Sequence, residues 1–347
     1  MSLLDLQTLP KTELHLHLEG AIPSEVLLGL IHKYNGAAET PDLACLNARL
    51  RYRDFQHFLD TWQWMCTFVR EYEDFTQIAH GVAKALAAQH VRYAELHISP
   101  PDFLGHGLSI SGICKAVRAG LDLAGEPEVA LITDLCRTYG PERGRCWLDE
   151  IIEVAAEAGI VGIGLGGPEH LAPAPPYADV FRHAALHGLR LVAHAGEAAG
   201  PESIWAALNS LGAERIGHGT LAVLDVDLMN HLREGGIPIE VCPTSNVCTG
   251  VVDGIERHPI RNMFTFGIRV TLSSDDPTFF GTDIVSEYQI LRDCFGFSDR
   301  EIMRVARTGF EVAFLSDRRR AELLRDFDDY CANDPATRGS AASHAAG

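Results

Sequence analysis

Short runs of apolar and β-branched residues recur along the chain, and longer segments of helical character separate them from the second run onward. Strands that alternate with helices are typical of parallel sheets, and eight such units predict an α/β protein with a (β/α)8 TIM barrel. A doubly wound open sheet is the alternative, but it usually has a glycine-rich phosphate turn after its first strand, which HLEGAIPSE is not. The eight runs cover residues 12–20, 91–100, 128–137, 159–167, 189–197, 214–220, 237–246 and 268–277.

The gap between the first two runs is much longer than the others. It contains a loop at 35–53 and an aromatic-rich segment at 54–75, which predict a helical insertion after the first strand. In a barrel this insertion lies on the catalytic face, so it is a candidate lid, although the aromatic residues are equally explained as helix core. Extra helices follow the last strand, so we expect one barrel domain over residues 1–333 and a disordered tail at 334–347.

Composition narrows the range of partners. The 347 residues are 46% hydrophobic, and 29 Lys and Arg against 47 Asp and Glu give a net charge of −18, which argues against nucleic acid or an anionic membrane. Neither a signal peptide nor an apolar membrane span is recognisable, and the nine cysteines form no CxxC pair, so we expect a cytoplasmic protein with free thiols. The sequence leaves the oligomeric state open, and a homo-oligomer is compatible with it.

The stretch TELHLHLEG contains His15 and His17, two residues apart in the first apolar run. In a strand, residues at this spacing point to the same face, so the two rings project together. Neutral imidazoles are good zinc ligands, and the spacing lets both rings reach one ion. A histidine pair of this kind is weak evidence on its own, because paired core histidines have the same pattern.

Ionisable residues also lie at the ends of three later runs: His194 and Glu197 at the fifth, His218 at the sixth, and Asp275 and Asp276 at the eighth. Burying so many polar groups without a ligand costs about several kcal/mol each unless all are paired. Three histidines and one aspartate provide a nitrogen and oxygen set suited to zinc. Cys242, in the seventh run, is interpreted as a core residue because the set is complete without a thiolate.

Five motifs, HLHLEGAI, HAGEAAGPESIW, ERIGHGT, CPTSN and SSDDP, together resemble the adenosine deaminase family of the amidohydrolase superfamily. The resemblance extends from about residue 10 to residue 333. It implies one zinc ion per chain, held by His15, His17, His194 and Asp275. Related barrels with two metals bridge them at the end of the fourth strand, and IGLGGPEH has no lysine for that purpose.

The resemblance also implies roles for the neighbouring residues. Glu197 would protonate N1 of a 6-aminopurine, and His218 would orient the zinc-bound water and take part in its deprotonation. Asp276 would hydrogen-bond N7, and the backbone N–H of Gly167 would contact N3. The small-molecule partner would therefore be a purine.

Two further pairs lie at strand ends. Metal-bound histidines usually need an acceptor on their other ring nitrogen, and Glu240 and Ser245 are expected to support the metal ligands from behind. The alternative is a buried polar pair with a structural role. Asp134 and Arg137, at the end of the third run, would line the pocket or pair with each other.

The chemistry agrees with these residue types. Zinc lowers the pKa of a bound water to about 7, and C6 of the purine becomes electrophilic once N1 is protonated by a buried glutamic acid. Attack at C6 and loss of ammonia leave the 6-oxo product. The HxE and PCxxC signature of the other zinc deaminases is absent. A catalytically inactive relative would have lost a metal ligand or the acid, and neither is lost here.

Two departures from the family's pattern bear on the substrate. Many adenosine deaminases read HLDG, whose aspartate helps hold the ribose 5′ hydroxyl, whereas this chain has Glu19, as adenine-specific relatives do. The usual LDLAGDE is here IGLGGPE, with Gly164 in place of the first aspartate, which leaves more room. The motifs HAGEAAGPESIW and HLEGAIP look closer to the nucleoside branch of the family than to the adenine branch. Adenosine and a 5′-modified adenosine such as 6-amino-6-deoxyfutalosine, from a menaquinone route, are therefore equal candidates, and adenine is third. The futalosine benzoate would need a cation, for which Arg51, Arg53 and Arg137 are candidates.

Overall fold

The computed structural model describes residues 3–52 and 55–333, so Arg53 and the tail at 334–347 lie outside the described residues. Eight parallel strands form one sheet in sequential order, and backbone contacts after the last strand close it against the first. The predicted TIM barrel is confirmed. The strands are β1 (Lys11–His17), β2 (Val91–Ile98), β3 (Glu128–Cys136), β4 (Ile160–Gly166), β5 (Arg190–Ala195), β6 (Arg215–His218), β7 (Ile239–Val241) and β8 (Val270–Leu272).

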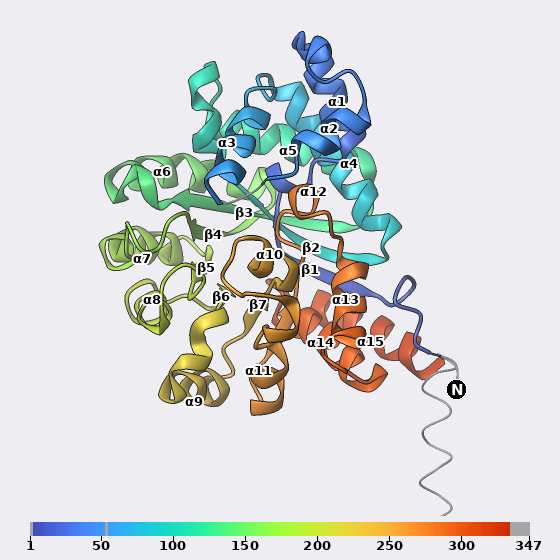
Figure 1. Cartoon of the computed structure of the whole chain (residues 1–347). Coiled ribbons are helices and arrows are strands. Elements are labelled where there is room, and N and C mark those ends of the chain that lie inside the picture. Colours follow the sequence, from blue (N-terminus) through green and yellow to red (C-terminus); the bar gives the residue numbers. More distant parts are fainter. Residues whose placement is uncertain (1–2, 53–54, 334–347) are drawn as a thin grey trace, which may run out of the picture.

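Helices surround this sheet (Figure 1). Four of them lie between β1 and β2, where the insertion is predicted, and the last four follow β8. Among the described residues, none of the helices has the length and apolar character needed to cross a bilayer. The helices are α1 (Ser24–Lys33), α2 (Leu43–Arg49), α3 (Phe55–Cys66), α4 (Tyr72–Ala88), α5 (Ile110–Ala124), α6 (Pro141–Ala158), α7 (Ala178–Leu186), α8 (Pro201–Ala206), α9 (Val226–Gly235), α10 (Pro243–Cys248), α11 (Ile260–Phe266), α12 (Pro277–Phe280), α13 (Ile284–Asp293), α14 (Asp299–Val312) and α15 (Asp317–Asn333).

The strands are buried on both faces, because helices cover the outer face and side chains fill the barrel interior. In β2, every residue except Arg92 is buried. Helix α5 illustrates the covering layer: the hydroxyl of Ser109 accepts a hydrogen bond from the N–H of Gly112 and caps the helix. Its apolar stripe, which includes Val117, then packs inward.

Closure of the barrel depends on Asp275, which follows β8. Its N–H donates to the carbonyl of His15 at 3.1 Å, and its carbonyl accepts from the N–H of His17 at 3.0 Å. The carboxyl ends of all strands in a parallel barrel meet at one rim. The polar residues predicted at the strand ends therefore share that rim.

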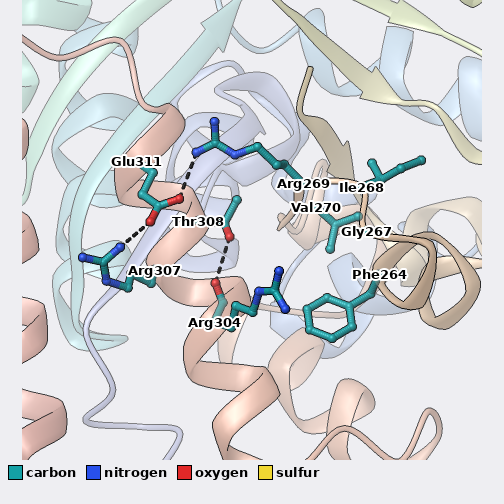
Figure 2. A pocket seen from close by; sticks show the side chains of 9 residues that line it. All are labelled: Phe264, Gly267, Ile268, Arg269, Val270, Arg304, Arg307, Thr308 and Glu311. Carbon is teal, nitrogen blue, oxygen red and sulfur yellow. Dashed lines mark hydrogen bonds and ion pairs between the residues drawn. The ribbon is translucent and has the colours of Figure 1, made fainter. Parts of the chain in front are cut away.

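A cavity of about 350 Å³ lies at the other, amino end of β8, between α11 and α14. Figure 2 shows that Arg269 and Arg307 both reach the carboxylate of Glu311, with Arg269 at 2.9 Å. None of the predicted site residues lines this cavity. It is therefore separate from the chemistry predicted for the carboxyl rim.

Replacing Gly309 of α14 with alanine is expected to destabilise the fold. A Cβ atom there would lie 2.0 Å from Oγ1 of Thr12 in β1, so the helix would have to move away from the strand. We expect the free energy of unfolding to fall by about 1–3 kcal/mol in urea denaturation. Gly29→Ala in α1 is the matched control, because nothing lies within 4 Å of its added Cβ. Equal effects of the two substitutions would contradict this packing argument.

Candidate active site

Four donor atoms converge at the carboxyl rim: Nε2 of His15, Nε2 of His17, Nε2 of His194 and Oδ1 of Asp275. Nε2 of His17 lies 3.1 Å from Nε2 of His194 and 3.3 Å from Oδ1 of Asp275. Nε2 of His15 lies 3.6 Å from the same oxygen. The fold thus brings together the four residues that the sequence predicts as metal ligands, from β1, β5 and the segment after β8.

This set fits a zinc ion on three observations. Tetrahedral zinc with ligand bonds of about 2.0–2.1 Å places its ligand atoms about 3.3 Å apart, close to the separations found here. Nε2 of His15 is buried and has no hydrogen-bond partner among the residues that the structure describes. Burial lowers the pKa of His15 and of His194 well below the ordinary value, so both rings are neutral, which is the form that binds metal.

Two residues of the rim have left-handed backbone conformations. The φ angle is 62° at His218 and 63° at Asp275. Such values are uncommon for residues that carry a side chain, and they persist where the surroundings determine them. At Asp275 the two backbone hydrogen bonds to β1 provide that constraint.

Glu240 and Ser245 lie directly behind two of these donors. Oε2 of Glu240 lies 2.8 Å from Nδ1 of His15, and the hydroxyl of Ser245 donates to Oδ2 of Asp275 at 2.6 Å. A carboxylate on Nδ1 holds the ring proton there and leaves the lone pair on Nε2 for the rim. The contacts are those expected of residues that orient metal ligands.

Asp134 on β3 takes the same place behind His17. Its Oδ2 lies 3.5 Å from Nδ1 of His17, and both carboxylate oxygens lie 3.1 Å from Nδ1 of His97 on β2. Burial alone would lower the pKa of His97, but Asp134 raises it above the ordinary value. A Cβ atom at Gly164 would lie 1.8 Å from Oδ1 of Asp134. The carboxylate of Asp134 therefore fills the space that a side chain at position 164 would need. This is the position of the first aspartate in the family's LDLAGDE pattern.

Glu240 is itself held by a buried ion pair. Its Oε1 lies 2.6 Å from Nε of Arg215, and the same guanidinium pairs with Glu95 and donates to the carbonyl of Val312 at 3.0 Å. Desolvation would lower the pKa of Arg215, but Glu95 and Glu240 raise it. A buried cation between two carboxylates satisfies both charges and fixes Glu240 against His15.

The loop after β5 presents Glu197 to the rim. Glu169 holds this loop by accepting hydrogen bonds from the N–H groups of Gly196, Glu197 and Ala198 at 2.8, 3.0 and 3.0 Å. Oε2 of Glu197 lies 3.6 Å from Nε2 of His218. Burial raises the pKa of Glu197 to about 7, against the opposing effect of His218. A carboxylic acid that keeps its proton near neutral pH can act as a proton donor.

Asp276 follows the ligand Asp275 and lies against the start of the insertion. A Cβ atom at Gly20 would lie 1.7 Å from Oδ1 of Asp276, so the glycine provides the space for this side chain. Burial, together with the neighbouring charge of Asp275, raises the pKa of Asp276 well above its ordinary value. A raised pKa favours the protonated form of Asp276, which can donate a hydrogen bond.

The other two predicted substrate-binding residues lie on different segments. Oε1 of Glu19, just after β1, accepts a hydrogen bond from the N–H of Ser99 at 2.9 Å, and burial raises the pKa of Glu19 to about 7. Gly167, just after β4, has a φ of 93°, a conformation that favours glycine.

Arg137 is buried and donates hydrogen bonds to two backbone carbonyls. Its Nη2 donates to the carbonyl of His194 at 2.7 Å, and its Nη1 donates to the carbonyl of Ala172 at 2.9 Å. The side chain therefore braces β5, and the expected alternative of a pair with Asp134 is wrong. Arg51 is exposed. Cys242 is fully buried, as its interpretation as a core residue requires.

Sequence reasoning missed four residues that support the rim: Glu95, His97, Arg215 and Asn246. Each is a buried polar residue within or next to an apolar run, where an unpaired group would be costly. Glu95 and His97 alternate in β2 as His15 and His17 do in β1, and this spacing was the available signal.

A parallel barrel whose carboxyl rim carries a buried cluster of histidines and carboxylates is the arrangement of a TIM-barrel enzyme. The family model described as "Adenosine deaminase" matches residues 10–330. The chain belongs to the adenosine deaminase family and is a hydrolase of the deaminase class. The resemblance drawn from the five sequence motifs is confirmed.

Several relatives match over almost their whole length. An aminodeoxyfutalosine deaminase of Streptomyces avermitilis is 36% identical over 93% of this chain and 92% of its own. An adenine deaminase of Rhizobium leguminosarum is 38% identical (91% and 98%), and an adenosine deaminase of Pectobacterium atrosepticum is 34% identical (91% and 95%). The crystal structure of an adenine deaminase from Arthrobacter aurescens superposes with a TM-score of 0.85 at 30% identity, over 92% of this chain and 98% of that chain.

Gly164→Ala is expected to weaken zinc binding. The added Cβ would displace the carboxylate of Asp134 from His17, and loss of such a supporting partner typically reduces metal affinity about 10–100-fold. Gly166→Ala is the matched control on the same strand, because its Cβ would make an ordinary 3.7 Å contact with His194. Chelator competition would measure zinc affinity in both variants. If Gly164→Ala binds zinc as tightly as the control, Asp134 does not support the metal site.

Proposed function

We propose that this protein catalyses the zinc-dependent hydrolytic deamination of a 6-aminopurine nucleoside to the 6-oxo product and ammonia. The observation that carries the proposal is the convergence of three imidazole nitrogens and one carboxylate oxygen beside the buried side chains of Glu197 and Asp276, whose pKa values burial raises. A metal site with an acid beside it can activate water and protonate a ring nitrogen in one reaction.

One zinc ion would be held by His15, His17, His194 and Asp275. Zinc in such a site supplies an activated water molecule near neutral pH. Glu240, Ser245 and Asp134 would keep the ligand atoms directed at the ion, since each lies against one of the ligands.

The remaining residues act on the purine. Glu197 donates its proton to N1, which makes C6 electrophilic, and His218 orients the attacking water because its Nε2 faces the space between Glu197 and Asp275. Asp276, protonated through burial, donates to the acceptor N7, and the N–H of Gly167 is directed to N3. Water adds its hydroxyl to C6, and its released proton restores Glu197. The hydroxyl proton then passes to the amino nitrogen, the bond between C6 and that nitrogen breaks, and ammonia leaves the 6-oxo product.

Within this class, a 5′-modified adenosine such as 6-amino-6-deoxyfutalosine is the substrate we favour, which would place the protein in menaquinone synthesis. Two Streptomyces relatives at 36% and 35% identity carry the name aminodeoxyfutalosine deaminase. Arg137 already donates to two backbone carbonyls. Arg51, which follows α2 and is exposed, is therefore the residue we favour, among those that the structure describes, to pair with the benzoate. Adenosine itself remains the nearest nucleoside alternative.

Deamination of free adenine is the second candidate function, and the position of Glu19 favours it. Its carboxyl group is buried and tied to Ser99, in the place where the family's nucleoside enzymes carry the shorter aspartate. The 38% identical Rhizobium relative is an adenine deaminase.

Steady-state kinetics on the zinc-loaded protein would test the proposal by comparing four compounds. We expect kcat/KM to be highest for 6-amino-6-deoxyfutalosine, then adenosine and 5′-deoxyadenosine, and lowest for adenine. Highest activity on adenine would favour the second candidate. Absence of activity on all four, with zinc bound, would contradict the purine assignment.

Glu197→Gln is expected to retain zinc and to reduce kcat by about 10²–10⁴-fold, because the variant lacks the acid that protonates N1. Glu202→Gln, an exposed change on α8, is the matched control and should leave kcat unchanged. Zinc content and kcat would be measured for both variants. A near-native rate in Glu197→Gln would remove this residue from the role of acid.

A further inference from the structure

A chain of hydrogen bonds leads from α11 to His218, and its first link sets the direction of all the others. The backbone N–H of Ile260 donates to Nδ1 of His258 at 3.2 Å. A backbone N–H can only donate, so Nδ1 of His258 must carry a lone pair. Burial lowers the pKa of His258 to about 3, so the ring is neutral and its proton lies on Nε2.

The second link fixes the orientation of the Asn246 amide. Nε2 of His258 lies 3.0 Å from Oδ1 of Asn246, and the hydroxyl of Thr220 donates to the same oxygen at 2.9 Å. The protonated Nε2 of His258 requires an acceptor, so the amide oxygen must face it. The amide nitrogen of Asn246 therefore faces the other way, towards Nδ1 of His218 at 3.2 Å.

The third link determines the proton position on His218. An amide nitrogen can only donate, so Nδ1 of His218 must accept. We propose that Asn246 and His258 are positioning residues that hold His218 as the tautomer protonated on Nε2, so that it enters the reaction as a hydrogen-bond donor.

The other side of the ring agrees with this tautomer. Nε2 of His218 lies 3.6 Å from Oε2 of Glu197 and 4.0 Å from Oδ2 of Asp275, and both groups can accept. A second proton on Nδ1 would face the amide N–H of Asn246 and leave two donors opposed. The acceptor oxygens in front of the ring and the amide N–H behind it therefore favour a proton on Nε2 and none on Nδ1.

This tautomer changes the role expected for His218 from the family resemblance. A neutral imidazole that already carries a proton on Nε2 cannot remove a second proton there. It can donate a hydrogen bond to the oxygen of the attacking water and so orient it. That role rests on the proposed deaminase function, whereas the tautomer itself does not.

The tautomer can be read from ¹⁵N NMR of the zinc-loaded, full-length protein with labelled histidine. Long-range ¹H–¹⁵N spectra distinguish protonated from unprotonated ring nitrogens, and the resonances of His218 are those lost in His218→Gln. We expect Nδ1 of His218 and Nδ1 of His258 to be unprotonated and both Nε2 atoms to be protonated. A proton on Nδ1 of His218 in the wild type overturns the proposal, whatever the substrate proves to be.

Asn246→Asp tests the cause. The carboxylate has the same shape but can only accept, so Nδ1 of His218 should shift to the protonated form. Thr220→Val is the matched control, because it removes a donor to Oδ1 of Asn246 and leaves His258 to fix the amide, so the tautomer should stay. An unprotonated Nδ1 in Asn246→Asp would show that Asn246 does not set the tautomer, and failure of that variant to fold leaves the wild-type spectrum decisive.

Discussion

The site depends on the closure of the barrel between its last and first strands. The strand β8 is only three residues long, yet Asp275, three residues beyond its end, exchanges backbone hydrogen bonds with both His15 and His17. These bonds hold Asp275 in a left-handed conformation and bring its carboxylate among the histidine rings. Without this closure, the donors of β1 and the donor after β8 would lie on two free edges of a sheet, and no common ligand could join them.

Burying such a cluster requires that each polar group has a partner or loses its charge. Arg215 balances Glu95 and Glu240, and Asp134 is shared by His97 and His17. These partners also decide where each proton lies. The supporting residues therefore do more than stabilise the barrel, because Glu240 behind His15 and Asp134 behind His17 direct Nε2 of these two rings to the rim.

The clustered donors and the helical insertion belong to different parts of the fold. The strands and the turns directly after them carry the donors, the acid and the residues assigned to the purine ring, and a closed barrel holds them rigidly. The proposed contact with the 5′ substituent, through Arg51, falls in the helical insertion after β1. Relatives of similar identity carry the names of aminodeoxyfutalosine, adenine and adenosine deaminases.

The sequence by itself determined the eight strands, the insertion and the chemistry-bearing residues at the strand ends, because alternation along a strand and apolar run length are local properties. It indicated His15 and His17 as a pair, since two residues in one strand share a face whatever lies around them. Only the tertiary structure decided which groups lie behind these residues. Gly164 reads as a small residue until β3 places Oδ1 of Asp134 1.8 Å from its missing Cβ. Asn246 reads as the last residue of the seventh strand-forming run until the structure places it in α10, with its amide between His218 and His258. Such contacts join positions far apart in the chain, and their geometry depends on strand order and register, which no local pattern contains.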